Sequence, residues 1–325
     1  MSAVTPIDVP VDSRTAGQLR TGEKAQERTA SGRAKRRLTS RGATIGALLI
    51  AILWTIPTFG LFISSLRPAG LINTTGWWTI FANPGFTLDN YSDVIGAGNS
   101  SLTFGSAFIN SLTITIPATV FPLVFASLAA YAFAWIDFKG RNWLFIAVFA
   151  LQIVPLQMAL IPLLSLFSRG FSIGNIQLFE GLGASGGYSQ VWIAHSIFAL
   201  PLAIFLLHNF ISEIPSEVIE AARVDGAGHG QIFFRIVLPL TVPAIASFAI
   251  FQFLWVWNDL LVALVFADGS VAPMTKLLAE ITGSRGQDWQ LLTSGAFLSI
   301  LVPLIVFFSL QRFFVRGLLA GSSKG

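Results

Sequence analysis

The chain of 325 residues is 54% hydrophobic and only 11% charged, with a mean hydropathy of +0.71. Soluble domains average about 45–50% apolar and about 25% charged residues, so this composition is typical of an integral membrane protein. The chain has no cysteine, which excludes disulfides, thiol chemistry and metal sites of the cysteine type. Its pI near 9.8 would suit a nucleic-acid partner. The positions of the basic residues indicate membrane topology instead, so no nucleic-acid partner is predicted.

The first 42 residues are polar and rich in Ser, Thr, Gly and Arg, which predicts a disordered tail. Its basic residues gather just before the first apolar run: Arg33, Lys35, Arg36, Arg37 and Arg41. That run covers about 24 residues, whereas the apolar region of a secretory signal has about 7–15. The run is therefore predicted to stay as a membrane anchor, with a basic flank that fixes its orientation and can contact anionic lipid.

Six stretches are apolar over the length of about 20 residues that a helix needs to cross a hydrocarbon core. Their continuous character predicts helices rather than the alternating strands of a barrel. The predicted fold class is all-α: a polytopic membrane helix bundle that forms one domain over residues 43–325. Its spans are expected at Ala43–Leu66, Gly105–Trp135, Trp143–Ser168, Val191–Ile211, Leu240–Phe266 and Thr293–Phe314.

Several predicted spans contain proline, namely Pro117, Pro122, Pro155, Pro162, Pro201 and Pro303. Proline deletes a backbone hydrogen bond and kinks a helix. Membranes tolerate the freed carbonyl where it meets another helix or a water-lined cavity. Kinked helices suit a bundle that opens around a path, but proline is also common in ordinary membrane helices. Both interpretations stay open.

The positive charges divide unequally between the two sides of such a bundle. With six spans both termini lie on one side, and that side carries 16 of the 20 Lys and Arg residues. Cytoplasmic loops carry the excess of Lys and Arg in membrane proteins. Both termini are therefore predicted to be cytoplasmic.

The sequence lacks the motifs of common enzymes. It has no GxxxxGK[ST] loop, no His-Glu-x-x-His and no GxSxG, and the GxGxxG pattern from Gly181 to Gly186 follows no strand. We predict no catalytic residue and no metal site. A membrane enzyme acting on lipid-linked sugar is disfavoured because no cluster of acids or metal ligands is present.

One acid, Asp259, lies inside a predicted span. A carboxylate at mid-bilayer costs roughly 2.5–3.5 kcal/mol on insertion scales, so it should face the bundle interior or water. One hypothesis makes the chain a proton-coupled secondary transporter that uses Asp259. The other makes Asp259 a structural polar group near the outer end of its helix.

A polar island over residues 212–239 separates the fourth and fifth spans. Pro215 suits the first turn of a helix, and Gly226 is a strong stop after Asp225. A second short helix is expected to run to Pro239. The loop carries four acids and two bases, which favours a protein partner over anionic lipid. In the first helix, Ala221 and Ala222 are predicted to form a small-residue surface open to that partner.

These residues resemble a known family, the binding-protein-dependent importers driven by ATP-binding-cassette (ABC) ATPases. Glu220-Ala221-Ala222, Gly226 four residues later, and Ile236-Val237-Leu238-Pro239 match its "EAA" loop. More of the chain is similar to the MalG-type carbohydrate permeases, with a weaker likeness to the α-glucoside branch. That similarity lies in Ala129–Ala134 with Phe138–Arg141, in Trp257-Asn258-Asp259, and in Gln311–Gly317 with Lys324-Gly325.

The resemblance implies a type I ABC importer permease whose EAA loop is a cytoplasmic coupling helix. Glu220, Ala221, Ala222, Asp225 and Gly226 would carry docking to an ATPase. It also implies a second permease subunit, two cytoplasmic ATPase subunits that bind ATP and Mg, and an extracytoplasmic sugar-binding protein. The chain itself would hold no cofactor. By the same resemblance, the outer loop Ala267–Leu292 would reach into the binding protein, and Lys324 and Gly325 would end a tail near the ATPases.

No sugar contact can be transferred from the family. Phe251, Trp255, Asn258 and Asp259 are candidates for a substrate path on this chain. Aromatic rings such as Phe251, Trp255 and Trp257 could stack on a sugar, but packing in the core or at an interface explains them equally. The nature of the sugar stays open.

Overall fold

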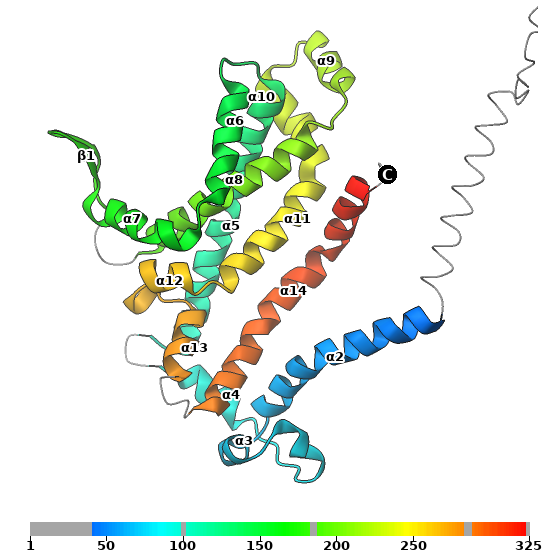
Figure 1. Ribbon diagram of the computed structural model, residues 1–325, viewed down its shortest axis with the longest axis vertical. Coiled ribbons are helices and arrows are strands. Elements are labelled where there is room, and N and C mark those ends of the chain that lie inside the picture. The colour runs from blue at the N-terminus through cyan, green and yellow to red at the C-terminus, as the bar shows by residue number, and fades with distance from the viewer. Residues whose placement is uncertain (1–40, 99–101, 183–186, 283–287, 323–325) are drawn as a thin grey trace, which may run out of the picture. The chain divides into compact units, whose positions relative to one another are not determined.

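The computed structural model describes residues 41–98, 102–182, 187–282 and 288–322 (Figure 1). The chain divides into two units, Met1–Gly60 and Leu61–Gly325. Most of the predicted tail, residues 1–40, lies outside the described residues, as do Lys324 and Gly325. Arg41 and Gly42 already belong to the first described helix, so the predicted end of the tail at residue 42 is slightly too late.

Helices dominate the described residues, as predicted. The elements in chain order are α2 (Arg41–Ser65), α3 (Ala69–Thr74), η1 (Trp77–Phe81), α4 (Asp89–Gly96), α5 (Phe104–Trp135), α6 (Arg141–Ala150), η2 (Leu151–Ile153), α7 (Leu156–Arg169), β1 (Phe171–Ile173), β2 (Ile176–Phe179), α8 (Tyr188–Ile211), α9 (Ser216–Val224), α10 (His229–Ile232), η3 (Phe233–Val237), α11 (Leu238–Trp257), α12 (Leu261–Phe266), η4 (Gly269–Val271), α13 (Met274–Thr282) and α14 (Trp289–Ser322).

The all-α fold class is confirmed, with one small hairpin as an exception. β1 and β2 form a small antiparallel hairpin in an outer segment, with every residue of both strands exposed. Gly174 makes the two-residue turn possible because it takes a positive φ of 59°.

Five of the six predicted spans are single helical runs in the described residues: α2, α5, α8, α10 through α11, and α14. The third is a pair, α6–η2 and α7, that bends by 104° at Val154 and Pro155. The break follows from Pro155, whose ring keeps the preceding residue out of helical geometry. The described chain thus has five spans, or six if the bent pair crosses as one.

The fifth span also differs from its predicted bounds. Its helical run begins at His229 rather than Leu240 and ends at Trp257 rather than Phe266. The short coupling-loop helix α10 is therefore continuous with the membrane helix α11, through the π-helical turn η3. Pro239 removes the N–H that would bond the Arg235 carbonyl, and the wider π turn precedes it.

The core of the second unit lies where α8 and α11 pack on α5, and α14 packs on α11. Figure 1 shows α9 and α10 at one end of these helices, with α4 and α13 at the other end. Small residues permit the close approach of α5 and α8, since Ala118, Ala126, Ala130, Ala194 and Ala203 are fully buried.

Three of the predicted spans' prolines have their freed carbonyls satisfied by side chains from neighbouring helices. Pro117 frees the Thr113 carbonyl, which accepts from Trp192 Nε1 at 2.9 Å. Pro122 frees the Ala118 carbonyl, which accepts from Gln252 Nε2 at 3.0 Å. Pro303 frees the Ser299 carbonyl, which accepts from Trp257 Nε1 at 3.1 Å. These contacts join α5 to α8, α5 to α11, and α11 to α14.

The outer segments are tied into this core through buried polar groups. Arg67 is 1% exposed and donates to the Gly76 carbonyl at 2.8 Å and to Thr75 Oγ1 at 2.7 Å. Asn110 of α5 donates to the carbonyls of Ser270 and Ala272 in the last outer loop. These bonds order the described parts of both segments.

An ion pair also stabilises the last outer loop. Lys276 Nζ donates to the Ala267 carbonyl at 2.9 Å and lies 3.1 Å from Asp268 Oδ1. The Gly269 backbone N–H, and then the Lys276 ammonium, hold the pKa of the Asp268 carboxyl below its ordinary value.

Candidate functional site

The coupling helix α9 is defined by local signals at both ends. Pro215 occupies its N-cap, and Glu217 lies in the first turn, where an acid interacts favourably with the helix dipole. At its end, the Gly226 N–H bonds to the Arg223 carbonyl at 3.0 Å, and the Ala227 N–H bonds to the Ala222 carbonyl at 2.9 Å. These two bonds make a Schellman motif, which needs the positive φ of 82° that Gly226 adopts. The predicted pair of helices around a glycine break is confirmed.

One face of α9 is anchored in the chain's own core. Ile219 and Ala222 are buried in a cluster that includes Phe233, Ile211 and Ala130. The predicted small-residue surface of Ala221 and Ala222 is therefore wrong as a single surface, because Ala222 is buried and Ala221 is exposed. Residues one apart on a helix differ by about 100° in direction, so burial of Ala222 leaves Ala221 outside.

The outward face combines acids with small and apolar residues. Glu217, Glu220, Ala221, Val224 and Asp225 are exposed, and Val224 has 86% of its surface accessible. Val224 is a candidate docking residue that the sequence reasoning missed. Its position four residues after Glu220 places it beside the EAA motif, which was an available signal.

Polar contacts fix α9 and α10 to the end of α5. Arg223 Nη2 donates to the Trp135 carbonyl at 3.1 Å, at the last turn of α5, where carbonyls lack helical partners. The Tyr131 hydroxyl lies 2.9 Å from His229 Nδ1. Tyr131 also packs against Phe233, with ring centroids 5.3 Å apart. These contacts attach α9 and α10 to the end of α5.

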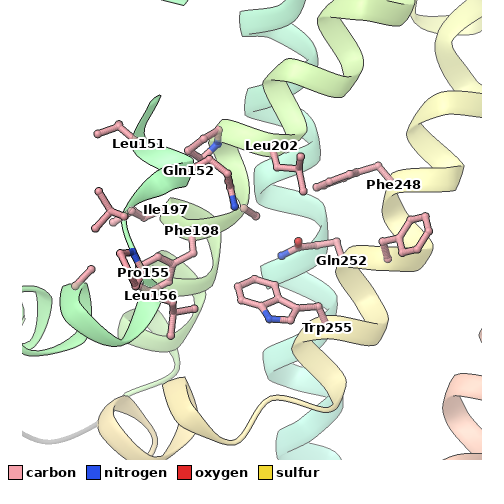
Figure 2. Close-up of a pocket in the computed structure, with 15 residues that line it drawn as sticks. Leu151, Gln152, Pro155, Leu156, Ile197, Phe198, Leu202, Phe248, Gln252 and Trp255 are labelled. Carbon is pink, nitrogen blue, oxygen red and sulfur yellow. The ribbon is translucent and has the colours of Figure 1, made fainter. Parts of the chain in front are cut away.

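A second candidate site is a cavity of about 590 Å³ between the broken third span, α8 and α11. Figure 2 shows Gln252 and Trp255 reaching into it from α11, with Gln152 and Phe198 on the opposite side. Of the predicted substrate-path residues, Phe251 and Trp255 line this cavity. Sequence reasoning missed Gln152, Gln252 and Phe198, because they lie on three separate segments.

The other two predicted path residues are placed elsewhere. Asn258 and Asp259 lie in the break after α11 and are absent from the lining of the cavity. Asn258 Nδ2 donates to the Leu254 carbonyl within its own segment. The predicted bounds placed Asp259 inside a continuous span. The break after Trp257 puts it outside any continuous helix.

Asp259 caps the next helix. From the position before the N-cap residue Leu260, its Oδ2 accepts from the backbone N–H groups of Val262 and Ala263 at 2.9 and 3.1 Å. The same oxygen lies 3.5 Å from His195 Nε2 of α8, and both side chains are buried. The acid therefore acts as a structural polar group near the outer end of the fifth span. His195 is its buried neighbour from α8.

The described residues contain no group of three or more His, Cys, Asp and Glu side chains that could hold a metal ion.

Comparison with known proteins agrees with this architecture. Residues 122–319 match the family described as "Binding-protein-dependent transport system inner membrane component". The chain is 54% identical over 286 residues to the osmoprotective compounds uptake permease protein GgtD of Synechocystis, covering 86% of this chain and 91% of the relative. It is 49% identical over 275 residues to the alpha-glucoside transport system permease protein AglG of Rhizobium meliloti, covering 83% of this chain and 70% of the relative.

A solved structure shares the fold. A chain of a bacterial ABC transporter involved in the import of the acidic polysaccharide alginate superposes with a TM-score of 0.60 at 19% identity. The alignment covers 85% of this chain and 98% of that one. The family match spans more than half of the sequence, including the coupling helix and both candidate sites. The chain belongs to the family of inner-membrane components of binding-protein-dependent transport systems.

Proposed function

We propose that this chain is a permease subunit of an ABC importer that carries a carbohydrate, with α-glucosides as the substrate class. The observation that carries the proposal is its 49% identity to a permease named for alpha-glucoside transport, over 83% of this chain. The outward face of α9, with Glu220 and Ala221 exposed, supports the coupling role.

The proposed complex contains a second permease, two cytoplasmic ATPase subunits and an extracytoplasmic sugar-binding protein. ATP and Mg are bound by the ATPase subunits, so this chain needs no cofactor and no catalytic residue of its own. Both termini lie on the cytoplasmic side, together with α9. The described outer loop from residue 267 to 282 faces the binding protein.

Coupling in this arrangement is mechanical. An ATPase that closes on ATP pulls on Glu220, Ala221 and Val224. Asp225 and Gly226 terminate α9 and so fix its length. The pull reaches the spans through Arg223 and the Tyr131–His229 contact. The two states must differ in their interaction with the ATPase, since only a differential interaction shifts an equilibrium.

Reconstitution into proteoliposomes tests the proposal. Proteoliposomes that contain this chain, the second permease, the ATPase subunits and the binding protein should accumulate a labelled α-glucoside such as trehalose or maltose. ATP is supplied on the ATPase side. Omission of the binding protein or of ATP should abolish uptake. Uptake driven by a pH gradient alone would overturn the proposal and return Asp259 to the role of a proton carrier.

A further inference from the structure

The cavity at the break of the third span has the chemistry of a sugar subsite. We propose that it binds one pyranose unit of the transported carbohydrate, with Trp255 as the stacking surface and Gln152 and Gln252 as hydrogen-bonding groups. This inference rests on the proposed function, because it names where on this chain the substrate of that importer would be held.

The first argument comes from the broken backbone. Irregular backbone at membrane depth is tolerated only where protein buries it or where it lines a water-filled cavity. The break at Val154 and Pro155 lies in the cavity wall. Beside the break the cavity is lined by Ile197, Phe198 and Pro201, near the middle of the 24-residue helix α8, and Gln252 and Trp255 of α11 face them (Figure 2). Under this rule the break is accommodated by a cavity that water can enter.

The second argument comes from the prolines. Pro201 removes the N–H that would bond the Ile197 carbonyl, one turn away on the same face of α8. Both residues line the cavity, and in the described part of the chain no side chain donates to that carbonyl. The carbonyls freed by Pro117, Pro122 and Pro303 are instead covered by Trp or Gln donors. Pro201 thus leaves the carbonyl of a cavity-lining residue without its helical donor.

The third argument is the composition of the wall. Apolar and aromatic side chains predominate, with two carboxamides that come from different segments, as in typical ligand sites. Each carboxamide offers both donors and an acceptor. Gln252 Nε2 donates one hydrogen bond to the Ala118 carbonyl. Its second N–H and its carbonyl oxygen are available to a ligand. No charged side chain lines the cavity, which favours a neutral polyhydroxylated ligand over an ion or a charged solute.

The fourth argument is that Trp255 is held in place. Its ring packs edge-to-face against His195, with centroids 5.2 Å apart and planes at 73°. His195 is held by a 2.9 Å contact between Nδ1 and the Val191 carbonyl, and its Nε2 lies 3.5 Å from Asp259 Oδ2. Such second contacts preorganise a binding group. The buried pair near the outer end of the fifth span therefore positions the stacking surface of the cavity.

The test uses the complete reconstituted complex and measures sugar transported per ATP hydrolysed. Trp255→Ala and Gln152→Leu should lower this ratio about two- to tenfold, the value of one aromatic or polar contact, while ATP hydrolysis persists. Trp255→Phe should stay within about twofold of wild type because the ring is kept. Trp54→Ala, at an exposed position of α2, is the control and should change nothing.

A chemical protection experiment keeps the inference falsifiable if a variant fails to assemble. The chain has no native cysteine, so Gln152→Cys introduces a single thiol at the cavity wall. Maltose or trehalose should slow its alkylation by N-ethylmaleimide in the working complex. It should leave the alkylation of Ser172→Cys, in the exposed outer hairpin, unchanged.

The outcomes separate the two proposals. If wild type transports an α-glucoside while the Trp255 and Gln152 variants keep the wild-type ratio, or sugar gives no protection, the cavity is not a sugar subsite and lipid or the second permease fills it. If wild type transports no carbohydrate with ATP, the proposed function itself fails.

Discussion

Single side chains in this protein donate hydrogen bonds to carbonyls that prolines leave unpaired in the spans. Trp192, Gln252 and Trp257 each donate to the carbonyl four residues before a proline on another helix. A carbonyl left unpaired in hydrocarbon costs several kcal/mol, so each donor links a kinked helix to its neighbour. The prolines and their donors should therefore be energetically coupled.

Trp257→Phe tests this coupling. The variant should lose about 0.6–2 kcal/mol, since interhelical bonds in membranes are modest. Pro303→Ala restores a backbone donor to the Ser299 carbonyl, so the double variant should be less destabilised than the two single effects added together. Thermal unfolding in detergent measures the stability of the purified complex with the wild-type chain, each single variant and the double variant.

Trp192→Phe is the matched control for that cycle. Its carbonyl partner is freed by Pro117, so Pro303→Ala should not rescue it and Pro117→Ala should. Rescue of both tryptophan variants by the same proline substitution would contradict the pairwise assignment.

Asp259 gives a second prediction at the residue scale. Asn caps helices about as well as Asp, so Asp259→Asn should retain assembly and at least half of ATP-driven uptake. Asp259→Ala loses the cap of α12 and should destabilise the complex by about 1 kcal/mol. Complete loss of uptake by an Asp259→Asn complex that assembles normally would point to a transport role for the carboxylate.

At the scale of elements, α9 is a short helix whose direction depends on its ends and on its anchored face. Gly226 terminates it with a positive φ, and nothing lies within 4 Å of a side chain added there. A substitution at Gly226 thus strains the backbone without an internal clash, and projects into the space where the proposed ATPase would dock.

Gly226→Asp and Gly226→Ala separate strain from docking. Both should cost about 1–2 kcal/mol of local stability, because both need a left-handed residue with a Cβ. Only Asp adds a charged group at the docking face, so it should weaken retention of the ATPase in pull-down experiments by tenfold or more, with membrane insertion intact. Normal uptake and normal co-purification of the Asp variant would overturn the coupling assignment.

For the whole molecule, the distribution of charge predicts which ends of the helices are cytoplasmic. The end with α9 and the α5–α6 turn carries Lys139, Arg141, Arg223 and Arg235, so it is predicted to be cytoplasmic, and the end with the hairpin and α13 is predicted to be external. Because the chain has no native cysteine, single thiols can report this directly.

Asp137→Cys in the α5–α6 turn and Ser172→Cys in the hairpin form a matched pair of exposed positions. In intact spheroplasts a membrane-impermeant maleimide should label Ser172→Cys and should spare Asp137→Cys until the membrane is opened. The reverse pattern would invert the predicted topology.

The sequence by itself determined the spans, the two-helix coupling loop and its glycine stop. These features depend on apolar length, proline and cap residues that are neighbours along the chain. The third and fifth spans were predicted less well, because the effect of Pro155 and of the Trp257–Leu260 break depends on what packs beside them.

Only the tertiary structure decided which face of α9 is open, which donors cover the prolines, and where the cavity lies. Gln252 and Ala118 are 134 residues apart, and Trp257 and Ser299 are 42 apart. Asp259 could be recognised as polar and buried, but His195 could not be identified as its partner. The local sequence predicts that a buried polar group requires a partner, and the packing of distant helices determines which group is that partner.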